Sequence, residues 1–314
     1  MLRYLLLIVG VFACSTAVIW IKLSTVHPVL LAGLRCLVAA AVLSPLTVRA
    51  ARRHRATLTR RDALRCVVPG LILSVHFVTW NLGARMTLAA NASLIVNLVP
   101  VVLPFFLFAV FRERLTRAEL AGTALALVGV LGMTAADFRI DRTHFLGDCV
   151  CFGSMLFFCV YLILARRNRD VPSLWLYVPP LYLVSGLAST AAALFWFDAG
   201  GAFFGADGTV AGREVLLVLA LGCIPTVVGH TILNVSMRHI RGQVVAVTNL
   251  AQCLFAAGLA FLALAETPHL SFYLAAALLL AGIVTALHAD RRAGKQPTLP
   301  AAQGDRGTGS TDTP

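Results

Sequence analysis

Histidine, asparagine and glutamine side chains stand out in this sequence because they interrupt long apolar stretches. His230 and Asn234 are four residues apart and Asn249 and Gln252 are three apart, so each pair shares one face of a helix. The residues of this kind, with one nearby tryptophan, are His76, Trp80, Asn81, Asn91, Asn97, His230, Asn234, Asn249 and Gln252. Their amides and imidazoles suit a pocket for a polar molecule. The alternative is hydrogen bonding between helices, worth about 0.6 kcal/mol per contact.

Two kinds of titratable residue bear on proton chemistry. An unperturbed imidazole titrates in the physiological range, so His76 and His230 are candidates for a proton relay or for hydrogen-bonded packing residues. None of the fourteen acidic residues lies in the middle of an apolar stretch. Glu113 and Glu266 stand at the ends of such stretches, where we expect them to cap or orient helix ends, and Asp148 opens another. The acidic residues therefore give little support to proton coupling.

Enzyme chemistry finds no support in the motifs. The sequence has no HExxH, GxSxG, Walker A or GxGxxG motif in a fitting place. The eight cysteines lie mostly within apolar stretches, and Cys149 and Cys151 lack the spacing of zinc ligands. We therefore expect no catalytic residue, no metal site and no cofactor.

The elements that position these residues are membrane-spanning helices. Of the 314 residues, 59% are hydrophobic and only 13% are charged. Apolar runs long enough to cross the hydrocarbon core recur along the chain, and lipid requires such runs to be helical. The sequence predicts an all-α polytopic membrane protein with ten spans, at 4–23, 28–48, 66–83, 88–110, 119–136, 147–165, 174–197, 215–235, 244–264 and 271–289.

The basic residues predict the orientation of these spans. With the N-terminus and C-terminus both cytoplasmic, the inner segments hold twenty Lys and Arg residues and the outer segments hold five. We expect a bacterial inner membrane protein, monomeric or weakly self-associating. The net charge of +12 requires no nucleic acid, because the cluster Arg49–Arg65 suits anionic lipid headgroups.

An internal repeat divides the chain into two halves. At an offset of 153 residues, Asn81 aligns with Asn234, Arg85 with Arg238 and Glu113 with Glu266. We expect two five-helix repeats, at 4–136 and 147–289, followed by a disordered cytoplasmic tail at 290–314. Because each half holds an odd number of spans, the second half is inverted relative to the first. Transporters built this way bind their substrate near the midplane.

Three stretches resemble the EamA-type proteins of the drug/metabolite transporter superfamily. They are HPVLLAGLRCLVAAAVL, LAANASLIVNLVPVVLPFFLFAVFRERLTRAELAGTALALVGVLGM and LAFLALAETPHLSFYLAAALLLAGIVTAL. The shared features are a Pro-x6-Arg element in helix two and a glutamate closing helix four before a Gly-rich helix five. The resemblance covers residues 4–289. The sequence departs from the family pattern in helix nine. Helix four carries Pro100 and Pro104, but the aligned stretch NLAQCLFAAG of helix nine has no proline. This difference predicts a straighter second half.

The resemblance implies a secondary transporter that exports small polar metabolites, such as amino acids, by alternating access. A drug, cation or sugar-derivative permease of the same superfamily is the alternative, and an integral-membrane enzyme is a remote one. Trp20 and Tyr161 are further candidates for cavity walls, although both also suit the aromatic belt at the membrane interface.

Arg35 is the one charge in the second span. A guanidinium in lipid is costly, so it must turn into the bundle or reach the interface. The resemblance implies that proteins with different substrates share this arginine. We therefore expect a buried, paired residue with a structural or gating role rather than a substrate-binding role, alongside Glu113, Glu266, Pro100 and Pro104.

Overall fold

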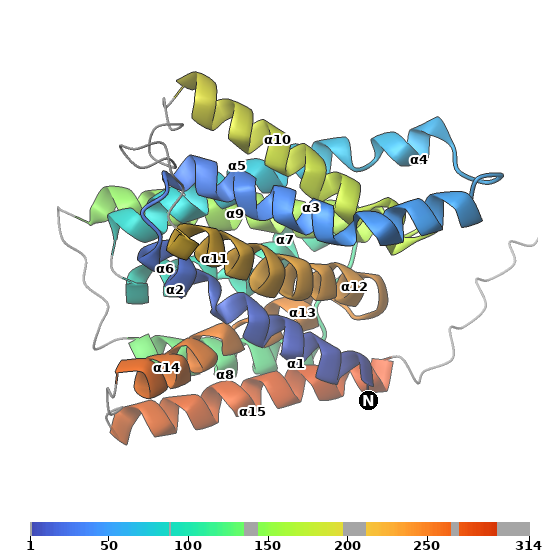
Figure 1. Ribbon diagram of the computed structural model, residues 1–314. Coiled ribbons are helices and arrows are strands. Elements are labelled where there is room, and N and C mark those ends of the chain that lie inside the picture. Colours follow the sequence, from blue (N-terminus) through green and yellow to red (C-terminus); the bar gives the residue numbers. More distant parts are fainter. Residues whose placement is uncertain (1, 88, 135–143, 197–211, 265–269, 294–314) are drawn as a thin grey trace, which may run out of the picture.

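The computed structural model describes residues 2–87, 89–134, 144–196, 212–264 and 270–293, and these residues form helices and no strand (Figure 1). In chain order the helices are α1 (Leu2–Ser15), α2 (Ala17–Leu23), α3 (Pro28–Arg53), α4 (Arg60–Leu64), α5 (Val67–Met86), α6 (Ala89–Val96), α7 (Val99–Phe111), α8 (Arg117–Thr134), α9 (Phe145–Arg167), the 3₁₀ turn η1 (Leu174–Leu176), α10 (Val178–Trp196), α11 (Gly212–Leu221), the π-helical segment η2 (Gly222–His230), α12 (Thr231–His239), α13 (Gly242–Asn249), α14 (Ala251–Leu264) and α15 (Leu270–Ala293).

The prediction of an all-α polytopic membrane protein is confirmed. Eight of the described helical segments are long and apolar enough to cross a membrane. The other two predicted spans, 119–136 and 244–264, correspond to α8 and to α13 with α14. Large apolar side chains such as Phe105, Leu187 and Leu274 are exposed on the outside of the bundle, as lipid contact requires. α15 continues to Ala293, so the predicted tail begins later than 290, and residues 294–314 lie outside the described residues.

Two spans are broken at equivalent places. α6 and α7 are separated at Asn97 and Leu98, just before Pro100, which occupies the first turn of α7. Pro104 lies inside α7. The corresponding span breaks at Leu250, between α13 and α14, although it has no proline. The prediction of a straighter second half is therefore wrong, because the Leu250 N–H bonds to the Val247 carbonyl in a tight turn that needs no proline.

The span that contains η2 is distorted for a local reason. Pro225 lies within the π-helical segment and has no backbone N–H to donate to the preceding turn. The hydroxyl of Thr226 donates to the Leu221 carbonyl instead, at 2.9 Å. Wide π-helical turns are often found at functional sites. Here the distortion brings Thr226 and His230 to the interior of the bundle, where both are buried.

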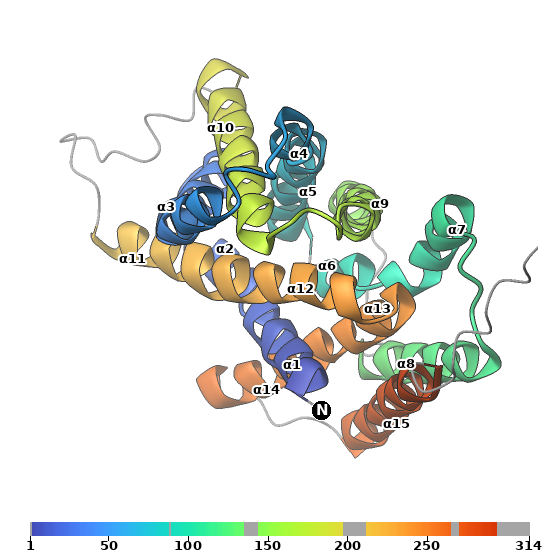
Figure 2. The same cartoon turned by 90° about the vertical axis from the view of Figure 1, so that its right-hand side faces the viewer.

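The helices pack in pairs that mirror one another across the chain (Figures 1 and 2). α3 lies along α10 and α8 along α15, while α5 packs on α9 and α1 packs on η2 and α12. The contacts in the first pair are reciprocal. Gly33 of α3 lies against Thr190 of α10, and Gly186 of α10 lies against Leu37 of α3. Small residues thus let the backbones approach closely, as membrane helices commonly require.

The close approach of α8 and α15 gives a first prediction. A side chain at Gly129 would place its Cβ 2.7 Å from the Ala275 carbonyl oxygen, so Gly129→Val forces the two helices apart. We expect a loss of about 1–3 kcal/mol in unfolding free energy. Thermal unfolding of the purified protein in detergent measures it. Gly153→Val in α9 is the matched control, because nothing lies within 4 Å of a Cβ there. Equal melting temperatures for the two variants would contradict the packing.

Candidate functional site

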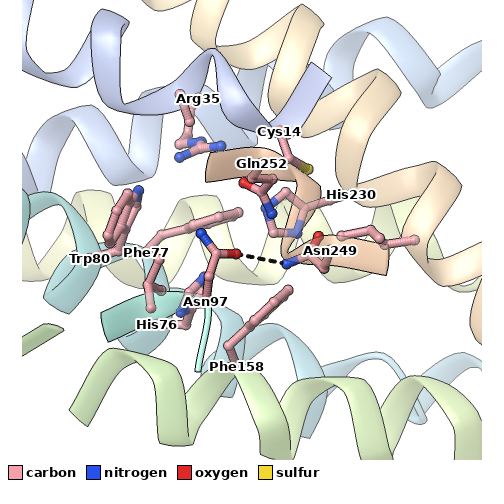
Figure 3. Close-up of a pocket in the computed structure, with 13 residues that line it drawn as sticks. Cys14, Arg35, His76, Phe77, Trp80, Asn97, Phe158, His230, Asn249 and Gln252 are labelled. Atoms are coloured by element: carbon pink, nitrogen blue, oxygen red, sulfur yellow. Dashed lines mark hydrogen bonds between the residues drawn. The ribbon is translucent and has the colours of Figure 1, made fainter. Parts of the chain in front are cut away.

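A cavity of about 40 Å³ lies in the interior, where broken and unbroken helices meet. That volume holds about three water molecules. Its lining comes from both halves of the chain and consists of Cys14, Ala17, Arg35, His76, Phe77, Trp80, Val96, Asn97, Phe158, His230, Leu233, Asn249 and Gln252 (Figure 3). A second cavity of about 20 Å³ shares five of these residues and adds Ser15, Val18 and Ser93. Together they form one polar region inside an apolar bundle.

The structure brings together six of the side chains that the sequence singled out. They are His76, Trp80, Asn97, His230, Asn249 and Gln252, from α5, the α6–α7 break, η2, α13 and α14. The side chain of Asn91 lies outside the described residues. Asn81, Asn234, Trp20 and Tyr161 do not line the cavity.

An asparagine pair joins the two broken helices. Nδ2 of Asn249 donates to Oδ1 of Asn97 over 3.2 Å (Figure 3). Nδ2 of Asn97 in turn donates to the Ser93 carbonyl over 2.8 Å. Both residues are buried. Breaks in membrane helices are tolerated where the freed polar groups line a cavity or find partners inside the protein. The pair therefore belongs to the interior polar region rather than to a lipid-facing surface.

Asn81, Asn234 and Tyr161 hold helices together instead. Nδ2 of Asn81 donates to the Pro28 carbonyl at 3.0 Å, which joins α5 to the start of α3. Nδ2 of Asn234 donates to the hydroxyl of Tyr161, which joins α12 to α9. Interhelical hydrogen bonding, the alternative left open by the sequence, describes these residues. Trp20 is half-buried in α2, which packs on α11.

The two histidines form one aromatic cluster beside the cavity. Their ring centroids are 6.3 Å apart. His76 stacks on Phe158 at 4.8 Å and hydrogen-bonds through Nδ1 with Ser154, whereas His230 meets the edge of Phe77 at 4.8 Å. Nδ1 of His230 has no hydrogen-bond partner among the described residues. The cluster supplies flat apolar walls with polar atoms at their rims.

Arg35 lies at the cavity, and its described partners are a hydroxyl and an aromatic ring. Its Nε donates to Oγ1 of Thr226 at 2.8 Å, and its guanidinium carbon lies 4.0 Å from the centroid of the Phe77 ring. The side chain is 1% exposed. Nη1 and Nη2 have no hydrogen-bond partner among the described residues, and no Asp or Glu occurs in the cavity lining. The charge is thus buried, as expected, and forms no ion pair within the described part of the chain.

Ion pairs at one end of the bundle connect several chain segments. Glu113 pairs with Arg166 at 2.7 Å, and Arg241 pairs with Glu119 at 2.6 Å and with Glu113 at 3.6 Å. Asp290 accepts hydrogen bonds from the Tyr4 hydroxyl at 2.8 Å and from the backbone of Arg241 at 3.2 Å. This set of residues, which we term the end network, links α1, α8, α9 and α15 with the segment after α7 and the residue before α13. It lies at the end that the sequence predicts to be cytoplasmic.

Different contacts tie the opposite end. Glu214 of α11 accepts hydrogen bonds from Ser24 at 2.7 Å and from Thr25 at 3.1 Å. The Thr87 hydroxyl donates to Asp148 in the first turn of α9 over 2.6 Å. Glu266, expected to orient a helix end here, lies outside the described residues.

The sequence missed several residues that the structure brings into these sites. Phe77, Phe158 and Cys14 line the cavity but have apolar side chains that resemble any other packing residue. Two patterns in the sequence could have pointed to further residues of these sites. Thr226 follows a proline in a span, and Thr116 and Glu119 have the threonine-to-glutamate spacing of a capping box, with Thr116 N–H donating to Glu119 at 2.8 Å.

A polytopic bundle with a polar cavity between its broken helices is the architecture of a membrane transporter. Residues 1–135 match the model of the EamA-like transporter family, which belongs to the drug/metabolite transporter superfamily. The resemblance seen in the sequence is thereby confirmed. A solved crystal structure, titled only "Crystal structure of protein", shares the fold with a TM-score of 0.72 and 20% identity, covering 92% of this chain and 98% of that one. No curated protein matches the chain.

Proposed function

We propose that the protein is a secondary transporter that exports small polar metabolites, amino acids or related compounds, across a bacterial inner membrane. The observation that carries the proposal is the asparagine pair at the cavity, because it joins broken helices from the two halves of the chain. Polar groups exposed by helix breaks at mid-bundle bind substrate in transporters of this architecture. A cationic drug is a poorer candidate substrate, since the described lining holds Arg35 and no carboxylate.

The two halves, 4–136 and 147–289, move as inverted repeats in this proposal. The mirrored helix pairs support the relation. Each of α3–α10, α7–α13 and α8–α15 joins helices at corresponding places in the two halves. Likewise, Gly83 of α5 lies against Cys151 of α9, and Gly229 of η2 lies against Cys14 of α1. Two such halves can rock about the cavity and expose it to each side in turn.

The end network closes the cytoplasmic side in the proposed cycle. Because Arg241 pairs with Glu119 and Glu113, opening that side separates ion pairs that are partly or fully buried. Such a separation costs several kcal/mol unless water or new partners compensate. The network thus stabilises the inward-closed conformation, and the contacts of Glu214 have the corresponding position at the other end.

The proposed orientation has both termini in the cytoplasm and the cluster Arg49–Arg65 beside anionic headgroups. Most of this cluster belongs to the end of α3 and to α4, and its arginines are largely exposed. Fusions after Lys295 test the orientation. A fluorescent-protein fusion is expected to glow and an alkaline phosphatase fusion to be inactive. The opposite pattern would overturn it.

The protein acts as a monomer or weak homo-oligomer in this proposal, without nucleic acid, metal or cofactor.

Counterflow into proteoliposomes tests the function. Vesicles loaded with an unlabelled amino acid are expected to accumulate the labelled form transiently, because exchange through one cavity needs no ion gradient. A panel of amino acids, sugars and organic cations should be compared with protein-free vesicles. Counterflow of sugars or cations without any amino acid would refute the proposed substrate class. Absence of counterflow for every member of the panel would refute transport of these classes.

A further inference from the structure

The two terminal nitrogens of Arg35 are the unexplained polar atoms of the cavity. Both are buried, and neither has a hydrogen-bond partner among the described residues. A buried donor without a partner destabilises the folded protein, and more so when the group is charged. Figure 3 shows the guanidinium extending from α3 toward Phe77 and the other labelled cavity residues. The cost is avoided if a bound group accepts from these nitrogens.

The other contacts of Arg35 orient this pair of donors. Thr226 holds Nε at 2.8 Å, and the Phe77 ring lies 4.0 Å from the guanidinium carbon. These two contacts restrict the rotation of the guanidinium. They leave Nη1 and Nη2 able to donate to a group bound in the cavity. An arginine fixed in this way presents parallel N–H groups, which match the two oxygens of a carboxylate.

The charge balance narrows the class of ligand. The described lining contains one arginine and no acidic residue, so it favours a single negative charge and repels a cation. A phosphate dianion is poorly matched, because one guanidinium compensates only one of its charges. The remaining walls are the rings of Phe77, Trp80 and Phe158 with Val96 and Leu233, which suit an apolar group.

We propose that Arg35 binds the carboxylate of the substrate and that the protein selects small monocarboxylates with an apolar side chain. This inference rests on the proposed function and specifies its substrate class. The amides of Asn249 and Gln252 also line the cavity, where they contact a second polar group of the substrate, such as an amine. The cavity of about 40 Å³ holds the carboxylate and little more, so the neighbouring helices separate to admit the rest. The inference assigns Arg35 a binding role in place of the structural role expected from sequence.

Thermal unfolding of the purified protein in detergent tests the binding directly, without transport. Four probes of similar size separate the charged groups: L-leucine, 4-methylpentanoate, leucinamide and isoamylamine. The two carboxylates are expected to raise the melting temperature in a saturable way, and the two amines are not. A ligand at ten times its Kd stabilises the folded protein by about 1.4 kcal/mol, so affinities near 1 mM are measurable.

Variants assign the effect to the arginine. Arg35→Gln is expected to weaken carboxylate binding by at least about tenfold. Arg213→Gln, which alters a largely exposed arginine that does not line the cavity, is expected to leave it unchanged. Arg35→Lys keeps the charge but loses the paired donors, and we expect intermediate affinity. If Arg35→Gln does not fold, the four-probe comparison on the unaltered protein still decides the question.

Three outcomes would overturn the proposal: equal stabilisation by leucinamide and leucine, equal stabilisation by chloride and 4-methylpentanoate, or none by either carboxylate. The proposed function fails separately. Carboxylate binding without counterflow of any amino acid would leave the site standing and remove the transport claim. Counterflow of an amino acid by a protein that leucinamide stabilises as much as leucine would remove the site and leave the transport claim standing.

Discussion

Glu119→Ala is expected to destabilise the protein by about 2–4 kcal/mol, because it leaves Arg241 without its shortest ion pair. The Glu119 side chain is 0% exposed and lies 2.6 Å from Nε of Arg241. It also accepts from the Thr116 N–H at 2.8 Å and so caps α8. The contact of Arg241 with Glu113 at 3.6 Å compensates in part. Thermal unfolding in detergent measures the loss.

A double-mutant cycle separates the ion pair from the cap. Glu119→Gln keeps an acceptor for Thr116 while removing the charge, and Arg241→Gln removes the partner. If the pair is the main contribution, the double variant is more stable than the sum of the single losses predicts, by at least about 1 kcal/mol. Additive losses would show that the two charges act independently and that the end network is not a coupled unit.

The surface pair of Arg65 and Asp170 provides the matched control. Nη1 of Arg65 lies 2.8 Å from Oδ2 of Asp170, but the Asp170 side chain is 60% exposed. The hydrogen bond from Arg65 is the main cause that lowers the pKa of Asp170 below its ordinary value. The small stabilisation is therefore present at neutral pH and is lost as the pH falls through the lowered pKa. Asp170→Asn is expected to change the stability by less than about 1 kcal/mol.

Ala17→Trp is expected to reduce counterflow to the level of protein-free vesicles. Ala17 begins α2 and lines the cavity, so an indole there occupies the space that the substrate needs. The cavity of about 40 Å³ is far smaller than the added side chain. Overpacking itself costs about 1–3 kcal/mol, which lowers the melting temperature without preventing folding.

Val9→Trp is the control for this substitution. Val9 lies on α1, which precedes α2 in the same predicted span, and its side chain is 44% exposed on the outside of the bundle. The same indole there faces lipid and should leave counterflow within about twofold of the unaltered protein. Full counterflow by the Ala17→Trp variant would show that substrate does not pass through this cavity.

Much of the architecture follows from the sequence because lipid permits few structures. Apolar length predicted helices at the places where α3, α5, α9 and α15 occur, since a span in lipid must satisfy its own backbone. The break at Leu250 was missed because it comes from a local hydrogen-bond shift that no proline announces. The same limit applies to η2, where Pro225 is visible in the sequence but the extent of the π-helical turns is not.

The cavity could be predicted in part. Polar residues are scarce in the apolar stretches and therefore stand out in the sequence. Asn97, Asn249 and His230 do line the same cavity. Asn81 and Asn234 look the same in the sequence but bond to Pro28 and Tyr161, and helix rotation decides between the two outcomes. For Arg35 the sequence indicates burial, since one charge in a span must avoid lipid. Its lack of a carboxylate partner in the described lining depends on neighbours from distant helices.

The central claim, that one cavity is exposed to each side of the membrane in turn, is tested most directly through Cys14. Its thiol is native, lines the cavity and is 7% exposed. With the other seven cysteines replaced by alanine, Cys14 should react with a membrane-impermeant thiol reagent in whole cells and, separately, in inverted vesicles. An amino acid that shows counterflow should slow both reactions. Labelling from one side only, in a variant that retains counterflow, would contradict alternating access through this cavity.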